Sequence, residues 1–150
     1  MKATFIFALL IAAAFTAGVD EWRKRSVYQI LTDRFYRSSG DTSPCMDLSR
    51  YCHGDFKGIT AKLDYIKGMG FDAIWISSPL DNLEGHEEAD GYHGYWHKNW
   101  EKINHHFGTE EDLHELVKTY QSNGIYVMVD VVPNHVAPVG HDYSGIYPFN

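Results

Sequence analysis

The sequence predicts an α/β fold built on a parallel sheet, and three observations support this prediction. The continuous apolar segments at 73–76 and 125–132 have the composition of strands that are covered on both faces. Each of these segments follows a stretch in which apolar residues recur at helical spacing. A further short β-branched and aromatic segment, 26–31, comes before the first of these stretches. The order β-α-β-α-β is typical of a parallel α/β sheet.

The amino-acid composition limits the classes of molecule that we expect this chain to bind. The chain has 150 residues, of which 44% are hydrophobic and 15% aromatic, and this indicates a globular protein. The formal net charge is −7, and no basic stripe is present that could neutralise a phosphate backbone, so we expect no nucleic-acid partner. The high aromatic content favours ligands that are bound by stacking or apolar contact.

The N-terminal segment has the order of a secretory signal. Lys2 precedes an uncharged run over 4–16, and small residues lead up to Gly18, where we expect cleavage. The run is short for a membrane span, although a membrane anchor is the alternative interpretation. We therefore expect residues 1–18 to be a signal peptide and residues 19–150 to be secreted, extracellular and free of the membrane. A processing site after Arg25 is a further alternative to an exposed, charged lead-in.

Two cysteines, Cys45 and Cys52, lie seven positions apart in a polar segment. In an oxidising compartment they most simply form one disulfide. A shared metal site is the alternative, but the spacing is not that of a zinc knuckle.

The first helix is predicted from Ile59, Leu63, Ile66 and Met69, and we expect it to end at the glycines that follow. The segment before it, through the cysteine pair, is expected to be a loop.

The second helix is predicted to begin after Thr109, which can cap it, and acidic residues follow in the first turn. Its apolar stripe comprises Leu113, Leu116, Val117 and Tyr120, and the helix is expected to end at 123–124.

Polar segments follow each predicted strand, at 33–34, 77–79 and 130–135. Functional groups in parallel α/β folds gather beyond the carboxyl ends of the strands, so we expect these segments to lie together. The connection from 78 to 108 is far longer than an ordinary βα loop, and loops of that length usually carry function.

An aromatic cluster lies within this long connection, at 90–100. It contains Tyr92, His93, Tyr95, Trp96, His97 and Trp100. Aromatic rings and flanking polar groups suit the apolar face and the hydroxyls of a sugar. The residues alone equally allow an aromatic mini-core that packs the loop on the sheet.

The sequence offers several candidate metal ligands. The segment 86–90 partly matches a zinc-protease helix, but Asp90 replaces the second histidine, so we do not expect such a site. We expect His97 and the pair at 105–106 to be solvated. Asn134 offers an amide oxygen that suits calcium, and His135 offers a ring nitrogen to a substrate hydroxyl, although an Asn-His pair after a strand is also typical of a turn.

Five segments, taken together and in order, resemble the secreted α-amylases of glycoside hydrolase family 13, particularly the fungal type: 31–35, 63–71, 73–76, 92–96 and 130–135. The resemblance extends from about 22 to 140. It implies that the chain forms the N-terminal part, about three βα units, of a (β/α)8 TIM barrel, truncated. It also implies endo-hydrolysis of α-1,4-glucosidic bonds in starch or glycogen, with retention.

The resemblance implies roles for individual residues. Substrate contacts fall on Tyr95, Trp96, His135 and His93; a calcium ligand on Asn134; structural support on Asp130; and a disulfide on Cys45 and Cys52. It further implies an α-glucan partner, calcium as the cofactor, with its site incomplete here, and a monomer when the enzyme is complete. Ser49 falls where fungal members place a substrate-binding Gln, which puts that contact in doubt.

No catalytic residue is expected within 1–150. Retaining hydrolysis needs two carboxyl groups about 5–5.5 Å apart, and the family places its catalytic carboxylates after later strands of the barrel. We therefore expect the chain by itself to be inactive. The alternatives are a non-catalytic secreted glucan-binding fragment and another activity of the family, such as α-glucosidase or transglycosidase.

Overall fold

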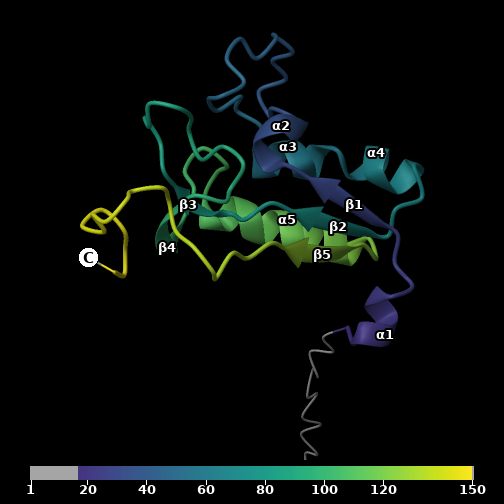
Figure 1. Cartoon of the computed structure of the whole chain (residues 1–150). Coiled ribbons are helices and arrows are strands. Elements are labelled where there is room, and N and C mark those ends of the chain that lie inside the picture. The colour runs from purple at the N-terminus through teal and green to yellow at the C-terminus, as the bar shows by residue number, and fades with distance from the viewer. Residues whose placement is uncertain (1–16, 150) are drawn as a thin grey trace, which may run out of the picture.

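A computed structural model of the chain describes residues 17–149 (Figure 1). Nearly all of the predicted signal peptide, residues 1–16, lies outside the described residues. The elements in order are α1 (Val19–Trp22), β1 (Val27–Ile30), α2 (Thr32–Phe35), α3 (Phe56–Ala61), α4 (Leu63–Gly68), β2 (Ala73–Ile76), β3 (Leu80–Asn82), β4 (His97–Ile103), α5 (Glu110–Ser122) and β5 (Tyr126–Val129). Among these helices, none is both long enough and apolar enough to span a bilayer.

The main sheet is parallel, as predicted. Its strand order is β1-β2-β5, and Ile74 of β2 lies between Tyr28 of β1 and Val127 of β5. A second, antiparallel sheet joins β3 to β4. The long connection over 78–108 is therefore partly regular structure, and its strands fix the position of the aromatic cluster.

The core lies between the helices and one face of the main sheet. Side chains from β1 and β2 meet apolar residues of α3, α4 and α5 there, and the fully buried members include Ile59, Ile66, Ile74, Ile76, Leu116 and Tyr120. Tyr120 Oη donates to the carbonyl of Ile59 at 2.8 Å, which joins α5 to α3. The predicted stripe of α5 is confirmed because all four of its residues belong to this core.

The prediction that the strands at 73–76 and 125–132 are buried on both faces is confirmed only in part. In β2, Ala73, Ile74 and Ile76 are buried and Trp75 is half-buried, whereas β5 is half-buried to exposed. Gln29, Trp75 and Met128 share one register and are exposed or half-buried. The covering helices lie on the opposite face, which holds Ile74 and Ile76. In a closed barrel, residues on the inward face pack against those of the other strands.

The prediction of one continuous helix in the connection between β1 and β2 was wrong. At Lys62 the backbone leaves helical geometry (φ −100°, ψ 14°), and this divides the segment into α3 and α4. The side chain of Asp55 caps α3 by accepting from Gly58 N at 2.6 Å. Met69 follows α4, lies outside the core and is 43% exposed.

The ends of α5 follow the sequence prediction. Thr109 Oγ1 accepts from Asp112 N, and the Asp112 carboxylate accepts from Thr109 N, which completes a capping box. The chain then turns at Gly124 (φ 75°) into β5. β5 ends at Val129 rather than 132 because its partner β2 ends at Ile76.

Candidate functional site

The polar segments after the three parallel strands lie together, as predicted. Thr32 N donates to Ser77 Oγ at 3.1 Å, which joins the end of β1 to the end of β2. Asp130 N donates to the carbonyl of Ile76 at 3.0 Å, which joins the end of β5 to β2. The carboxyl edge of the sheet is therefore a single polar surface.

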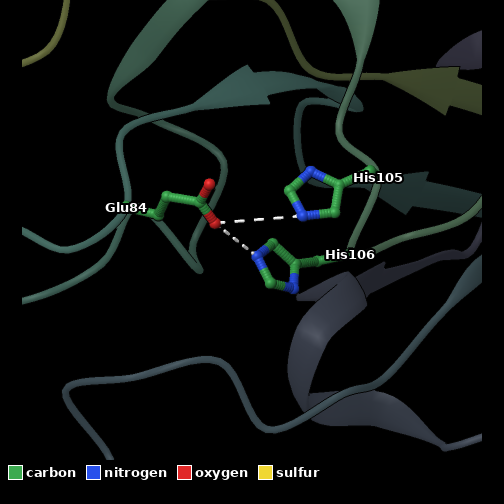
Figure 2. A group of neighbouring side chains, drawn as sticks. All are labelled: Glu84, His105 and His106. Atoms are coloured by element: carbon green, nitrogen blue, oxygen red, sulfur yellow. Dashed lines mark hydrogen bonds and ion pairs between the residues drawn. The ribbon is translucent and has the colours of Figure 1, made fainter.

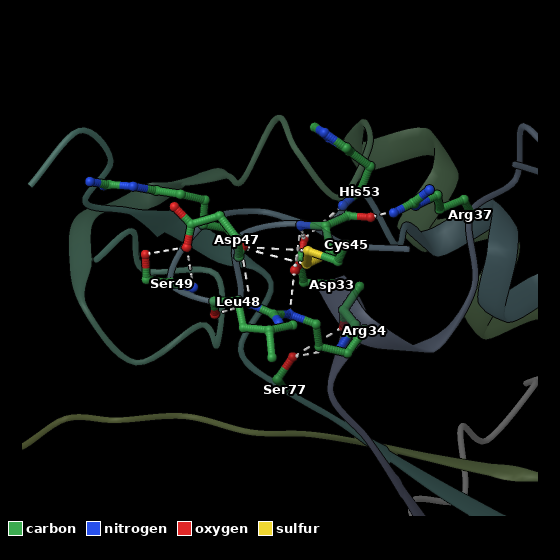
Figure 3. A network of polar contacts seen from close by, with 12 residues as sticks. Asp33, Arg34, Arg37, Cys45, Asp47, Leu48, Ser49, His53 and Ser77 are labelled. Carbon is green, nitrogen blue, oxygen red and sulfur yellow. Dashed lines mark hydrogen bonds and ion pairs between the residues drawn. A yellow bond between two sulfur atoms is a disulfide. The ribbon is translucent and has the colours of Figure 1, made fainter. Parts of the chain in front are cut away.

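Asp33 organises one side of this edge (Figure 3). Its carboxylate accepts from Cys52 N at 2.8 Å, His53 N at 3.1 Å and Arg34 Nε at 2.8 Å, and the residue is only 1% exposed. Burial raises the pKa of Asp33, and these hydrogen bonds and Arg34 oppose the rise. Asp33 is thus a structural carboxylate, and Cys52, which it holds, forms the predicted disulfide with Cys45.

The turn over 91–96 is fixed above the end of β2. Gly94 has φ 90°, and a Cβ atom there would lie 2.7 Å from the carbonyl oxygen of Ser78, so only glycine fits this close approach. Trp96 N donates to Oδ1 of the buried Asn82 at 2.6 Å. The sequence did not indicate a role for Asn82, because a single Asn in a polar segment has no pattern that marks it as buried.

Tyr95, Asp130 and His135 form the centre of the candidate site. Tyr95 Oη donates to Asp130 Oδ2 at 3.0 Å, and His135 Nε2 lies 2.8 Å from the Tyr95 carbonyl oxygen. Burial, together with the hydrogen bond and the charge of Asp130, raises the pKa of Tyr95 to about 12. The phenol therefore stays neutral at ordinary pH and keeps a fixed orientation.

His93 and Trp96 extend this centre. The His93 ring stacks on Tyr95 at 5.6 Å between centroids and meets Trp96 edge-on at 5.0 Å. Burial lowers the pKa of His93, and the nearby positive groups of Arg34 and His135 act in the same direction. The guanidinium of Arg34 also lies 3.8 Å above the ring of Tyr92, a cation–π contact that the sequence did not indicate.

His97 is not solvated as predicted; it is fully buried. Its Nε2 lies 2.8 Å from Ser78 Oγ, and its carbonyl accepts from Ala137 N at 3.0 Å. The segment after 135 thus contacts the start of β4. The segment 86–90 forms a loop rather than a helix, in agreement with the expectation that it is not a zinc-protease motif.

Asn134 and His135 line a cavity of about 720 Å³ beside this centre, together with Trp100, Tyr143 and Phe149. Asn134 is exposed there, and its amide oxygen is a hard donor of the kind that calcium prefers. Calcium takes about six to eight oxygen ligands, so Asn134 fits the ion as one ligand of a larger set. Over residues 17–149, the one group of three or more acidic, histidine or cysteine side chains gathered closely enough to share an ion lies elsewhere, at Glu84, His105 and His106.

Comparison with known proteins agrees with this geometry. The family model described as the catalytic domain of alpha-amylase matches residues 29–145. The chain belongs to the α-amylase family. The match includes the carboxyl edge of the sheet, the aromatic turn and the loop after β5.

Similar proteins include fungal α-amylases. The chain is 49% identical to alpha-amylase 3 of Schizosaccharomyces pombe over 97% of its own length and 27% of that protein. It is 49% identical to the alpha-amylase of Saccharomycopsis fibuligera over 89% of its length and 28% of that protein. The chain therefore spans little more than a quarter of these relatives.

Solved structures of the family share the fold. An alpha-amylase from Malbranchea cinnamomea has a TM-score of 0.81 and 46% identity, over 87% of this chain and 29% of that one. A cyclomaltodextrin glucanotransferase of three domains has a TM-score of 0.67 and 40% identity, over 76% of this chain and 26% of that one. The described residues thus form the N-terminal part of a (β/α)8 barrel, with three of its parallel strands.

Proposed function

We propose that this chain supplies the sugar-binding side of a secreted α-amylase that cleaves internal α-1,4 bonds of starch or glycogen with retention. The observation that carries the proposal is the joined set of Tyr95, Asp130 and His135 at the carboxyl edge of the sheet. Active sites of (β/α)8 barrels lie at this edge.

The arrangement suits a pyranose ring. The side chain of Tyr95 is held by Asp130 and stacked by His93, so its ring is a fixed plate for the apolar face of a sugar. His135 is exposed beside Tyr95. Its Nε2 atom contacts the Tyr95 carbonyl oxygen, and its Nδ1 atom can bind a sugar hydroxyl group. Trp96 adds a second aromatic side chain on the same turn, and His93 lies between the two.

Asn134 would hold calcium as one ligand among several in the complete protein. When bound, the ion would tie together the loops that carry it. The position of Asn134, directly before His135, supports this role, because fixing the backbone at 134 also orients the imidazole that contacts the sugar.

The chain by itself is proposed to bind glucan without cleaving it. The two carboxylates at the strand ends are already used, since Asp33 is buried among backbone donors and Asp130 holds Tyr95. A retaining mechanism needs a nucleophile and an acid that face the glycosidic bond from about 5–5.5 Å apart. Those groups are expected to come from other parts of the barrel.

Secretion is proposed on two grounds. The sequence over 1–18 has the order of a signal peptide. The disulfide between Cys45 and Cys52 is typical of proteins that fold in an oxidising compartment.

Titration of the purified protein with a maltooligosaccharide, followed by calorimetry, tests the proposed site. Trp96→Ala is expected to weaken binding by about tenfold, the scale of a lost aromatic contact. Trp22→Ala is the matched control, because Trp22 lies before β1, where it packs edge-on against Tyr126 at the opposite end of the sheet, and it should leave binding unchanged. Equal affinities for the native protein and Trp96→Ala, with both folded by circular dichroism, would contradict the assignment.

A second candidate is glucan transfer, favoured by the 40% identity to a cyclomaltodextrin glucanotransferase. The described residues serve either reaction, because both begin with binding of the same sugar. Product analysis of the complete protein with starch separates them: hydrolysis yields linear oligosaccharides, whereas transfer yields cyclic or elongated ones.

A further inference from the structure

Glu84, His105 and His106 lie close together (Figure 2). Glu84 follows β3, whereas the two histidines follow β4, so the group joins two separate loops. Glu84 Oε2 lies 2.8 Å from His106 Nε2 and 3.9 Å from His105 Nε2. The three potential ligand atoms all lie within 4.8 Å of one another.

The donor set indicates the class of metal. Two imidazoles and one carboxylate form a ligand set that zinc uses when its fourth position is open to water. Calcium and magnesium prefer oxygen ligands, so two nitrogen donors disfavour both ions. Zinc binds nitrogen and oxygen at about 2.0–2.2 Å, so small rotations of these partly exposed side chains would bring the three atoms around one ion.

The surroundings hold the ligands in place. The ring of His106 stacks on the buried Tyr51 at 3.7 Å between centroids, and its backbone N donates to Asn104 Oδ1 at 3.0 Å. Asn104 Nδ2 in turn donates a hydrogen bond to Tyr51 Oη at 3.0 Å. The stack on Tyr51 and the backbone hydrogen bond restrict the position of the His106 ring.

The loop that carries Glu84 is also anchored. Gly85 N donates to Asp90 Oδ1 at 2.6 Å, and Arg50 bridges Asp90 and the carbonyl of His86. The Arg50 guanidinium is thereby paired with Asp90, which leaves the Glu84 carboxylate to the two histidines.

We propose that Glu84, His105 and His106 form a binding site for a divalent transition metal of the zinc class, which ties the loop after β3 to the turn after β4. The ion takes the place of the proton between His106 Nε2 and Glu84 Oε2, and that proton passes to solvent. The site does not include Tyr95, Trp96, Asn134 or His135, so it is independent of the glucan-binding proposal.

Isothermal titration of the purified protein with zinc chloride near neutral pH tests the proposal. One zinc per chain is expected. Glu84→Gln and His105→Ala should each weaken binding by at least about tenfold, because each removes a direct ligand. His106→Phe should do the same while keeping the stack on Tyr51.

Glu110→Gln is the matched control, since Glu110 lies 3.9 Å from His114 as an exposed pair outside the group, and it should leave zinc affinity unchanged. Unchanged zinc affinity in Glu84→Gln would overturn the proposal, because the two histidines alone would then account for zinc binding. This result would overturn the proposal whether or not the variant is folded. Displacement of zinc by an equal concentration of calcium would overturn the assignment to a transition metal.

Discussion

Individual histidines in this chain have different surroundings. His97 is fully buried against Ser78, whereas His135 is exposed beside Tyr95. The sequence pattern did not indicate that His97 is buried, because this burial depends on the segment around Ala137, forty residues later. Tyr95 and His135, by contrast, were identified because their motifs lie at strand ends, where parallel folds place their chemistry.

Burial of His97 makes stability depend on pH. Burial lowers its pKa below the value of about 6.5 of an exposed imidazole. As pH falls, the unfolded chain therefore takes up a proton before the folded chain does, so the stabilisation is fully present above about pH 6.5 and is lost toward the lower folded-state pKa. The free energy of unfolding should decrease between about pH 7 and pH 5.

His97→Gln should make this decrease shallower, with urea unfolding at several pH values as the measurement. His93, whose pKa is also lowered, should retain part of the dependence. His114→Gln on the exposed face of α5 is the control and should leave the slope unchanged. A slope in His97→Gln equal to that of the native chain would refute the role given to this burial.

Secondary-structure elements were predictable where a local pattern decides them. Thr109 caps α5 as expected, and β2 occupies the expected apolar segment. The break at Lys62 was not predictable, because Ile59, Leu63 and Ile66 keep helical spacing through it. α3 packs against α5, where Tyr120 Oη donates to the carbonyl of Ile59, and such contacts are not encoded in local periodicity.

The aromatic turn depends on Gly94. Gly94→Ala combines a positive φ with a Cβ contact of 2.7 Å to the Ser78 carbonyl, so the turn must move away from β2. We expect a loss of about 2 kcal/mol in the free energy of unfolding, within the range for overpacked sites, together with weaker maltooligosaccharide binding. Urea unfolding and calorimetry measure the two effects.

Gly124→Ala separates the two causes of that loss. Gly124 also has a positive φ, 75°, but a Cβ atom there meets nothing within 4 Å. The Gly124→Ala variant should therefore show the effect of backbone strain alone. We expect a smaller decrease in the free energy of unfolding and unchanged binding of maltooligosaccharide. Equal decreases in the free energy of unfolding in Gly94→Ala and Gly124→Ala would show that the close approach of residue 94 to Ser78 does not fix the turn.

At the scale of the whole molecule, the described residues form an open part of a barrel. β1 and β5 are the outer strands of the three-stranded sheet, and the apolar side chains Val129 and Val131 are exposed at the end of β5. The barrel family and its first three parallel strands could be predicted from ordered motifs. The exposure of one face of the sheet could not be predicted, because an apolar segment has the same sequence whether or not neighbouring strands cover it.

Release of reducing ends from starch by the purified 150-residue chain tests most directly the claim that this chain binds glucan but does not hold the catalytic carboxylates. The account predicts no hydrolysis, while binding of maltooligosaccharide that depends on Trp96 is retained. Hydrolysis by this chain that disappears in Trp96→Ala would contradict the claim, because it would place the complete reaction within these residues.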